Sequence, residues 1–153
     1  MSEQTYDVDI VNVSAVTTAV ARERVQADQI SRRIIPLFDR VYEFLKAAPV
    51  RQAGNNIALY SNQSKGAMDM EAGVPVTGPF ESTATIFCSS LPEGRAAHTV
   101  HRGPYSELKG PHEAVQRWCK DQGLRLAGPC WEIYGDWNED PALLQTDVYY
   151  LLA

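Results

Sequence analysis

Three features are scarce in this sequence: clustered basic residues, long apolar runs and cysteine. The 14 Lys and Arg residues are dispersed and outnumbered by 19 Asp and Glu residues, which gives a formal net charge of −5. Because nucleic-acid binding needs a concentrated cationic surface, we expect no direct binding to DNA or RNA. No apolar run reaches the roughly eighteen residues that a membrane-spanning helix needs, so we also expect no membrane partner.

The three cysteines, Cys88, Cys119 and Cys130, show no C-x-x-C spacing. A disulfide framework and a thiolate zinc site are therefore not expected, and small buried thiols in a reducing cytoplasm are the ordinary interpretation. The N-terminal sequence MSEQTYDVDI has no basic segment followed by an apolar one. This argues against a secretory signal and favours a cytoplasmic location.

Sequence patterns for metals, nucleotides and nucleophiles are missing as well. His98 and His101 form an H-x-x-H pair, but residues three apart in a strand point to opposite faces and cannot share one metal ion. The glycines form neither a G-x-G-x-x-G nor a Walker pattern, so no nucleotide cofactor is indicated. Ser89, Ser90 and Cys119 have no visible His and Asp partners. We expect neither a metal nor a cofactor.

The composition is that of one compact domain. The 153 residues are 44% hydrophobic and 22% charged. A chain of this length can bury roughly two-thirds of its unfolded surface without disulfides or a structural metal. We therefore expect a single domain over residues 1–153.

The chain also matches itself at an offset of 74 positions. Laying residues 31–60 over residues 105–134 aligns six identical pairs, where chance would supply about two. The same offset brings residues 7–76 onto residues 81–150, so we predict two repeats with about these boundaries. The identical pairs are Val41/Val115, Lys46/Lys120, Arg51/Arg125, Ala53/Ala127, Gly54/Gly128 and Tyr60/Tyr134.

Each predicted repeat has the same order of elements. Strand segments come first, then an amphipathic helix, then two short strands separated by turn residues. We therefore predict an α+β fold of duplicated β-α-β-β units with pseudo-two-fold symmetry, an antiparallel sheet, two main helices and a central groove. The predicted strands cover residues 7–13, 16–25, 56–61, 70–76, 84–89, 95–101, 130–137 and 146–151.

Apolar stripes place the two helices. The first stripe runs from Ile30 to Leu45, and Pro36 inside it predicts a kink or a separate first turn. The second helix is expected to be capped by Ser106 and to end at Gly123.

The repeats differ chemically at one position of their third strand. In the second repeat this strand reads CWEIY (residues 130–134), and alternation puts Glu132 and Tyr134 on the face opposite Trp131. The first repeat has Ala58 and Tyr60 at the matching positions. A carboxylate among aromatic residues would be desolvated and able to hold a cation or transfer a proton. An ordinary alternative stays open, namely a solvated carboxylate or one paired with Arg95, Arg102 or Arg125.

Two further candidates lie near the expected groove. Met70, with Met68, belongs to a segment at the groove rim, where adaptable thioethers suit varied ligands, although a mobile turn is the commoner explanation. Trp137 is ambiguous, because a bulge after Gly135 would change the face that it presents.

Three segments carry a family resemblance. They are TVHRGPYSEL (residues 99–108), the helix at residues 113–122 with Trp118, and WEIY (residues 131–134). Together they resemble the GyrI-like small-molecule-binding proteins, also described as bacterial transcription-activator effector-binding domains. The resemblance covers essentially the whole chain, and the pair H-x-G-P-Y and W-E-x-Y at this spacing is fairly specific.

The resemblance implies a central groove for amphipathic, often cationic or polycyclic compounds. The family's binding-site Glu falls on Glu132, and its aromatic wall on Tyr105, Tyr134 and Trp137. Relatives occur fused to DNA-binding domains, as gyrase-modulating proteins, and as stand-alone proteins. Some of the stand-alone proteins look like hydrolases that open strained cyclopropane rings.

Our hypothesis is a stand-alone binder of a small amphipathic or cationic molecule, with Glu132, Tyr134, Tyr60, Tyr105, Trp137, Ala58 and Met70 as ligand-binding residues. If the protein is a hydrolase, Glu132 would be its acid, base or electrostatic stabiliser, and Tyr105 would donate a hydrogen bond. Whether turnover occurs stays open. The alternatives are a modulator of a macromolecule such as DNA gyrase, for which no residue is matched, and an effector-sensing regulator without its own DNA-binding domain.

Overall fold

The computed structural model describes residues 5–153 and contains two α-helices and eight strands in this range. Residues 1–4, part of the segment used above to argue against a secretory signal, lie outside it. The elements are β1 (Asp9–Val13), β2 (Val16–Gln26), α1 (Ile30–Leu45), β3 (Ile57–Ser64), β4 (Ala67–Pro75), β5 (Phe87–Leu91), β6 (Gly94–Arg102), α2 (Lys109–Asp121), β7 (Leu126–Tyr134) and β8 (Gln145–Leu152).

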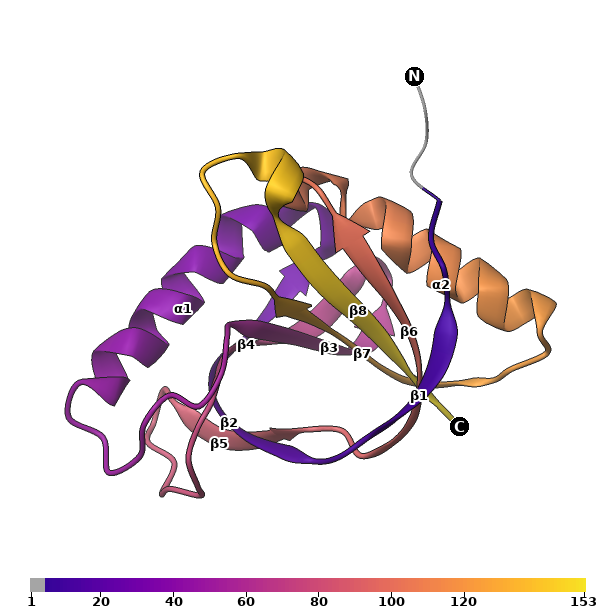
Figure 1. Ribbon diagram of the computed structural model, residues 1–153. Coiled ribbons are helices and arrows are strands. Elements are labelled where there is room, and N and C mark those ends of the chain that lie inside the picture. The colour runs from indigo at the N-terminus through magenta and orange to yellow at the C-terminus, as the bar shows by residue number, and fades with distance from the viewer. Residues whose placement is uncertain (1–4) are drawn as a thin grey trace.

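All eight strands form one antiparallel sheet in the order β1-β6-β8-β7-β3-β4-β2-β5. The sheet is strongly curled, and both helices lie on one side of it (Figure 1). The order β-β-α-β-β occurs twice along the chain, first as β1 to β4 with α1 and then as β5 to β8 with α2. Each strand of the first set lies as far from one edge of the sheet as its counterpart in the second set lies from the other edge. The predicted α+β class with pseudo-two-fold symmetry is therefore confirmed, whereas the boundaries 7–76 and 81–150 stay a prediction.

The first strand of each set is exchanged between the halves. β1 pairs with β6 of the second set, and β5 pairs with β2 of the first. The two inner strands β3 and β7 meet at the centre, with Ala58 directly opposite Glu132. Because these residues are also related by the offset of 74, the pseudo-two-fold axis passes between them.

Side chains on the two faces of the sheet form separate cores. On the helix side, Leu37 and Val41 of α1 and Val115 of α2 pack in one buried cluster with residues of the strands. On the opposite face the strands build a second cluster around Trp131, which stacks on Tyr149 with ring centroids 5.2 Å apart. Strand alternation puts Trp131 in one core and its neighbour Glu132 under the helices.

Helix α1 follows its apolar stripe but differs from the sequence prediction at Pro36. The buried positions are Ile34, Leu37, Phe38 and Val41, at the spacings of one helix face. Pro36 is exposed and lies inside one continuous α-helix, which a short 3₁₀ turn at Ala27–Gln29 precedes. The proline therefore does not separate a first turn.

Helix α2 begins later than its sequence suggests. Tyr105–Glu107 form a 3₁₀ turn, α2 starts at Lys109, and no side chain caps its first residues. The prediction that Ser106 caps the helix is wrong, because Ser106 is inside the preceding turn. Gly123, with φ of +69°, follows the helix end as expected.

Close backbone packing shapes the strands around the centre. Strands β3 and β4 are joined by Lys65 and Gly66, both with positive φ, as in a tight two-residue hairpin. A Cβ on Gly73 of β4 would lie only 1.9 Å from the carbonyl oxygen of Ala19, so β2 can approach only a glycine there. Strand β7 ends at Tyr134, and the predicted continuation to Trp137 is wrong.

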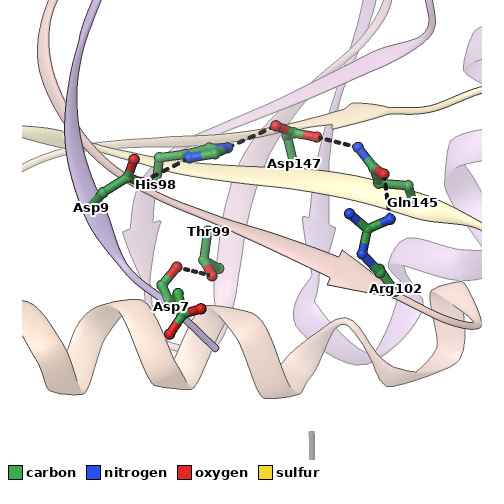
Figure 2. Close-up of polar contacts among 7 residues, drawn as sticks. All are labelled: Asp7, Asp9, His98, Thr99, Arg102, Gln145 and Asp147. Carbon is green, nitrogen blue, oxygen red and sulfur yellow. Dashed lines mark hydrogen bonds and ion pairs between the residues drawn. The ribbon is translucent and has the colours of Figure 1, made fainter. Parts of the chain in front are cut away.

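A polar cluster fastens β1 to the sheet. His98 on β6 lies between Asp9 of β1 and Asp147 of β8, with its ring nitrogens 3.0 and 2.7 Å from their carboxylate oxygens (Figure 2). The side chain of Gln145 donates a hydrogen bond to Asp147 and accepts one from Arg102.

No helix within residues 5–153 is long and apolar enough to cross a membrane.

Candidate functional site

A pocket of about 1160 Å³ lies on the helix side of the sheet, over the centre where β3 and β7 meet. Its wall combines residues of α1, α2 and the inner strands with Tyr105 of the turn before α2 and Trp137 beyond β7. The lining is mainly apolar and aromatic, with a few polar groups among it. Such a composition is typical of a site for a small organic molecule.

Glu132 is the buried acidic side chain of this pocket, whereas Asp28 and Asp136, which also line it, are exposed. Glu132 lies in the middle of β7 opposite Ala58 and is 4% exposed. The alternative of a solvated strand carboxylate is therefore wrong, and within residues 5–153 its ion-pair partner is a histidine rather than one of the arginines considered. A carboxylate in this position needs hydrogen-bond donors, because burial without them is costly.

Two tyrosines donate to one oxygen of the carboxylate. The hydroxyl groups of Tyr60 and Tyr134 lie 3.2 and 2.5 Å from Glu132 Oε1. Burial, followed by the charge of Glu132, raises the pKa of both tyrosines well above the ordinary value. Both phenols are therefore protonated and act as donors.

A histidine holds the other oxygen. His112 of α2 places Nε2 at 2.7 Å from Glu132 Oε2. Its Nδ1 lies 2.7 Å from the hydroxyl of Tyr150, which also accepts a hydrogen bond from Gln116 at 3.1 Å. The result is a buried chain of polar groups that runs from β3 through β7 to α2 and β8.

The network keeps His112 protonated. Burial is the largest single influence on its pKa and acts to lower it, but the nearby Cys130 together with the hydrogen bond to Glu132 and the charge of Glu132 outweigh it and raise the pKa to about 9. At neutral pH His112 and Glu132 therefore form an imidazolium–carboxylate pair, which can exchange a proton or hold polar ligand groups.

The matching place in the first half is apolar. The offset of 74 relates His112 to Phe38 just as it relates Glu132 to Ala58. Phe38 contacts the ring of Tyr134 edge-on, with centroids 6.3 Å apart. The second half thus contains both Glu132 and its ion-pair partner His112, whereas the first half has apolar residues at both matching positions.

Aromatic rings form the wall beside Glu132. Tyr105 packs edge-on against Tyr134 with centroids 5.5 Å apart. At the mouth, Trp137 is 73% exposed and Ile35 of α1 is also exposed, although both line the pocket. A ligand that covers these side chains would bury apolar surface that the free protein leaves in water.

Five of the seven predicted ligand-binding residues lie together in the pocket wall: Glu132, Tyr134, Tyr60, Tyr105 and Trp137. Ala58 and Met70 are each 0% exposed and do not line the pocket. Met70 pairs with Glu23 and Tyr60 in the middle of the sheet, and Met68, nearer the strand end, lines the pocket instead. A ligand contact by each of the seven stays a prediction.

Sequence reasoning missed His112 and Tyr150. The offset of 74 aligns His112 with Phe38 in the sequence itself. A signal was present, because a polar residue at a buried position of the half that carries Glu132 needs a polar partner. Tyr150 gave no such signal, since alternation along β8 does not show which helix residue lies above it.

The metal prediction concerns two other histidines. His98 bonds to Asp9 and Asp147, while His101 bonds to Tyr6 and to the carbonyl of Pro104, so the two rings have separate partners. Among residues 5–153 no group of three or more His, Cys, Asp or Glu side chains is placed to hold a metal ion. All three cysteines are free thiols.

The family follows from comparison with known proteins. A model of the GyrI-like small molecule binding domain matches residues 6–152 of this chain. The chain belongs to the GyrI-like family. No curated protein matches this GyrI-like sequence.

Solved structures share the GyrI-like fold at low sequence identity. The C-terminal domain of EcmrR has a TM-score of 0.85 and 22% identity, with 98% of this chain and 99% of that chain covered. EcmrR in its complex with DNA has a TM-score of 0.80 and 21% identity, and the match covers 96% of this chain but only 57% of that chain.

Two further solved structures are also similar. SAV2435 bound to tetraphenylphosphonium has a TM-score of 0.69 and 14% identity, with 96% of this chain and 94% of that chain covered. A hydrolase from Listeria innocua has a TM-score of 0.59 and 12% identity, with coverages of 95% and 91%. At these identities the likeness shows the fold alone.

Proposed function

We propose that this GyrI-like domain binds amphipathic or polycyclic cations in the pocket over β3 and β7. The single observation that carries the proposal is the buried carboxylate of Glu132 at the base of an aromatic pocket. A carboxylate supplies the opposite charge, and each cation–π contact with an aromatic face contributes about 0.5–2 kcal/mol. The similar structure of SAV2435 bound to tetraphenylphosphonium supports the same ligand class.

The pocket wall matches both parts of such a ligand. Glu132, with Tyr60 and Tyr134, faces the charged centre, while Phe38, Tyr105 and Trp137 offer apolar surface to aromatic rings. The exposed side chains at the mouth favour ligands with an apolar body larger than the cationic group alone.

The test is binding of tetraphenylphosphonium and of the neutral triphenylphosphine oxide, measured by calorimetry and by thermal shift. We expect a cation present at one hundred times its dissociation constant to add about 2.7 kcal/mol of stability. Glu132→Gln should weaken binding of the cation by at least about tenfold and leave the neutral compound little changed, because the amide keeps the shape and loses the charge.

Glu93→Gln is the matched control, since Glu93 is exposed in the connection between β5 and β6 and does not line the pocket. It should bind both compounds as the unmodified chain does. Equal binding of the cation by the Glu132→Gln and Glu93→Gln variants would refute the proposal.

Hydrolysis of strained rings is a second candidate, favoured by the imidazolium–carboxylate pair beside the ligand space. Glu132 would activate water or stabilise positive charge that develops as a ring opens, with Tyr105 or Tyr134 as hydrogen-bond donor. Mass spectrometry of a cyclopropane-containing compound after incubation detects turnover directly. Turnover that persists in the Glu132→Gln variant would exclude this catalytic role.

A further inference from the structure

The pair formed by His112 and Glu132 creates an electrostatic problem for a pocket that binds cations. Both side chains line the pocket, and the imidazolium lies 2.7 Å from the carboxylate. Together the two charges cancel. A cationic ligand beside them would leave one uncompensated positive charge in a poorly solvated cavity, where like charges repel strongly.

We propose that His112 is a specificity-determining residue of this pocket, and that a permanent cation binds beside Glu132 in exchange for one proton of the His112 imidazolium. The inference rests on the proposed function of the same pocket. In the exchange, one N–H bond of the imidazolium breaks and its proton passes to solvent. Beside the carboxylate of Glu132, the ligand then supplies the positive charge that the imidazole gives up.

The hydrogen bonds around His112 suit both of its protonation states. In the charged state, Nε2–H donates to Glu132 and Nδ1–H donates to the hydroxyl of Tyr150. In the neutral state, Nε2–H still donates to Glu132, while Tyr150 can turn its own hydroxyl proton toward Nδ1 and accept from Gln116. After loss of the Nδ1 proton, His112, Tyr150 and Gln116 therefore all keep a hydrogen-bond partner, which removes the usual cost of such a change.

The groups packed around His112 allow this assignment. Glu132 and Cys130 face it from β7, and Tyr150 faces it from β8. On β6, which also packs against α2, the buried His101 is bonded to Tyr6 and to a backbone carbonyl instead. Tyr60 and Tyr134 lie on the far oxygen of Glu132, and Lys109 lies 3.7 Å from Glu113. The other ionisable groups of the pocket wall are Asp28, Tyr42, Tyr105 and Asp136.

His112 carries the exchangeable proton under ordinary conditions. With its pKa raised to about 9, the imidazole is protonated at neutral pH in the free protein. A nearby cation works in the opposite direction and lowers the pKa, because it disfavours the charged ring. Cation affinity should then rise as the pH approaches 9, by up to about tenfold per unit, which is the slope for release of one proton.

The first experiment counts protons. Calorimetric titration with tetraphenylphosphonium at pH 7.5, in phosphate and in Tris, gives the number of protons released from the difference in buffer ionisation enthalpy. We expect close to one proton per bound cation, and none for triphenylphosphine oxide, which has similar rings and no charge.

The second experiment identifies the source of the proton. The chain has three histidines, so nitrogen NMR of the imidazole rings resolves each one, and His112→Gln assigns the signal of interest. Saturation with tetraphenylphosphonium should convert His112 from the charged to the neutral pattern. His98→Gln, which removes a histidine outside the pocket wall, should release the same number of protons as the unmodified chain.

The outcomes separate this inference from the proposed function. A cation that binds without proton release, while His112 keeps its charged NMR pattern, overturns the exchange and leaves cation binding in place. A release that originates elsewhere, with His112 unchanged, overturns it too. No binding of tetraphenylphosphonium at any pH between 6 and 9 refutes the proposed function and the exchange together.

Discussion

Single residues decide the character of the pocket. The two halves share a tyrosine at the matching positions Tyr60 and Tyr134, yet one half adds Glu132 and His112 where the other has Ala58 and Phe38. A buried ion pair contributes little net stability compared with apolar residues of similar size, whereas removal of one member leaves an uncompensated charge. We therefore interpret the pair as retained for binding rather than for stability.

A double-mutant cycle tests this interpretation at the same scale. His112→Phe introduces the residue that the first half has at the matching position, Phe38, and leaves the buried Glu132 carboxylate without its ion-pair partner. The substitution should therefore lower the free energy of unfolding by roughly 3 kcal/mol at pH 7. Adding Glu132→Ala introduces the residue that matches Ala58 of the first half. The double variant should regain at least about 1 kcal/mol of unfolding free energy relative to His112→Phe, because the isolated charge is gone. Urea unfolding of the four proteins measures both quantities.

The expected signature is a coupling between the two substitutions, since their side chains touch. Losses that simply add in the double variant would mean that the two residues do not stabilise each other in the folded protein.

Elements place these residues, and their boundaries depend on contacts outside the element. Helix α2 begins at Lys109 rather than directly after a cap at Ser106, because Tyr105–Glu107 form a 3₁₀ turn that brings Tyr105 to the pocket. Strand β7 ends at Tyr134, so Trp137 leaves the sheet and reaches the mouth. Apolar spacing predicted both elements but not these ends, since helix and strand ends depend on hydrogen bonds that spacing does not encode.

The attachment of β1 to β6 gives a prediction at the scale of elements. The hydrogen bond to Asp147, the largest influence, together with Asp9, raises the pKa of His98 above 6.5, although burial opposes them. A raised pKa means that the contact stabilises the fold fully below about pH 6.5 and loses this contribution as the pH rises through the folded value. The bond from His98 also lowers the pKa of Asp147 below 3.8, so the contact weakens again in strong acid.

His98→Gln should therefore lower the hydrogen-exchange protection of the β1 amides by about two- to fivefold at pH 6, the range of a partly exposed ion pair, and by less at pH 9. The amides of β3 are the internal control, because β3 does not pair with β1. The same loss of protection at both pH values would argue against a charged contact.

At the scale of the whole molecule, the pocket lies where the pseudo-symmetric halves meet. Strands β3 and β7 pair across the axis, and β1 and β5 are exchanged between the halves, so the two sets share one sheet. For the proposed function, one carboxylate near the axis predicts one cation per chain rather than one per half. The alternative role, modulation of a macromolecular partner, would use an outer surface instead.

The two roles respond differently to substitutions in the pocket. Glu132→Gln combined with Tyr134→Phe should weaken binding of tetraphenylphosphonium by more than about tenfold, since the charge and one donor are lost. Any effect of the protein on gyrase supercoiling would be unchanged by the pair if an outer surface is responsible. Loss of a gyrase effect in this variant would instead connect the pocket to that partner.

The sequence alone determined the class of the fold and the main acidic group. Periodicity gave two helices and eight strand segments in the right order, because burial of apolar side chains follows the repeat of each backbone conformation. The alternation of side chains along the strand placed Glu132 and Trp131 on opposite faces of the sheet. Comparison of the two halves identified Glu132 as the position where a carboxylate replaces the Ala58 of the first half.

Tertiary structure decided what Glu132 contacts. His112 is twenty positions earlier and Tyr60 seventy-two positions earlier in the chain. No local sequence pattern predicts that α2 packs over β7 so that His112 contacts Glu132. For the same reason Met70 is buried in the core whereas Met68 lines the pocket. Both side chains lie on one face of β4, and they differ only in which residues of other elements pack over them. Charge pairing across elements depends on packing distances, and these follow from the assembled fold rather than from the order of residues.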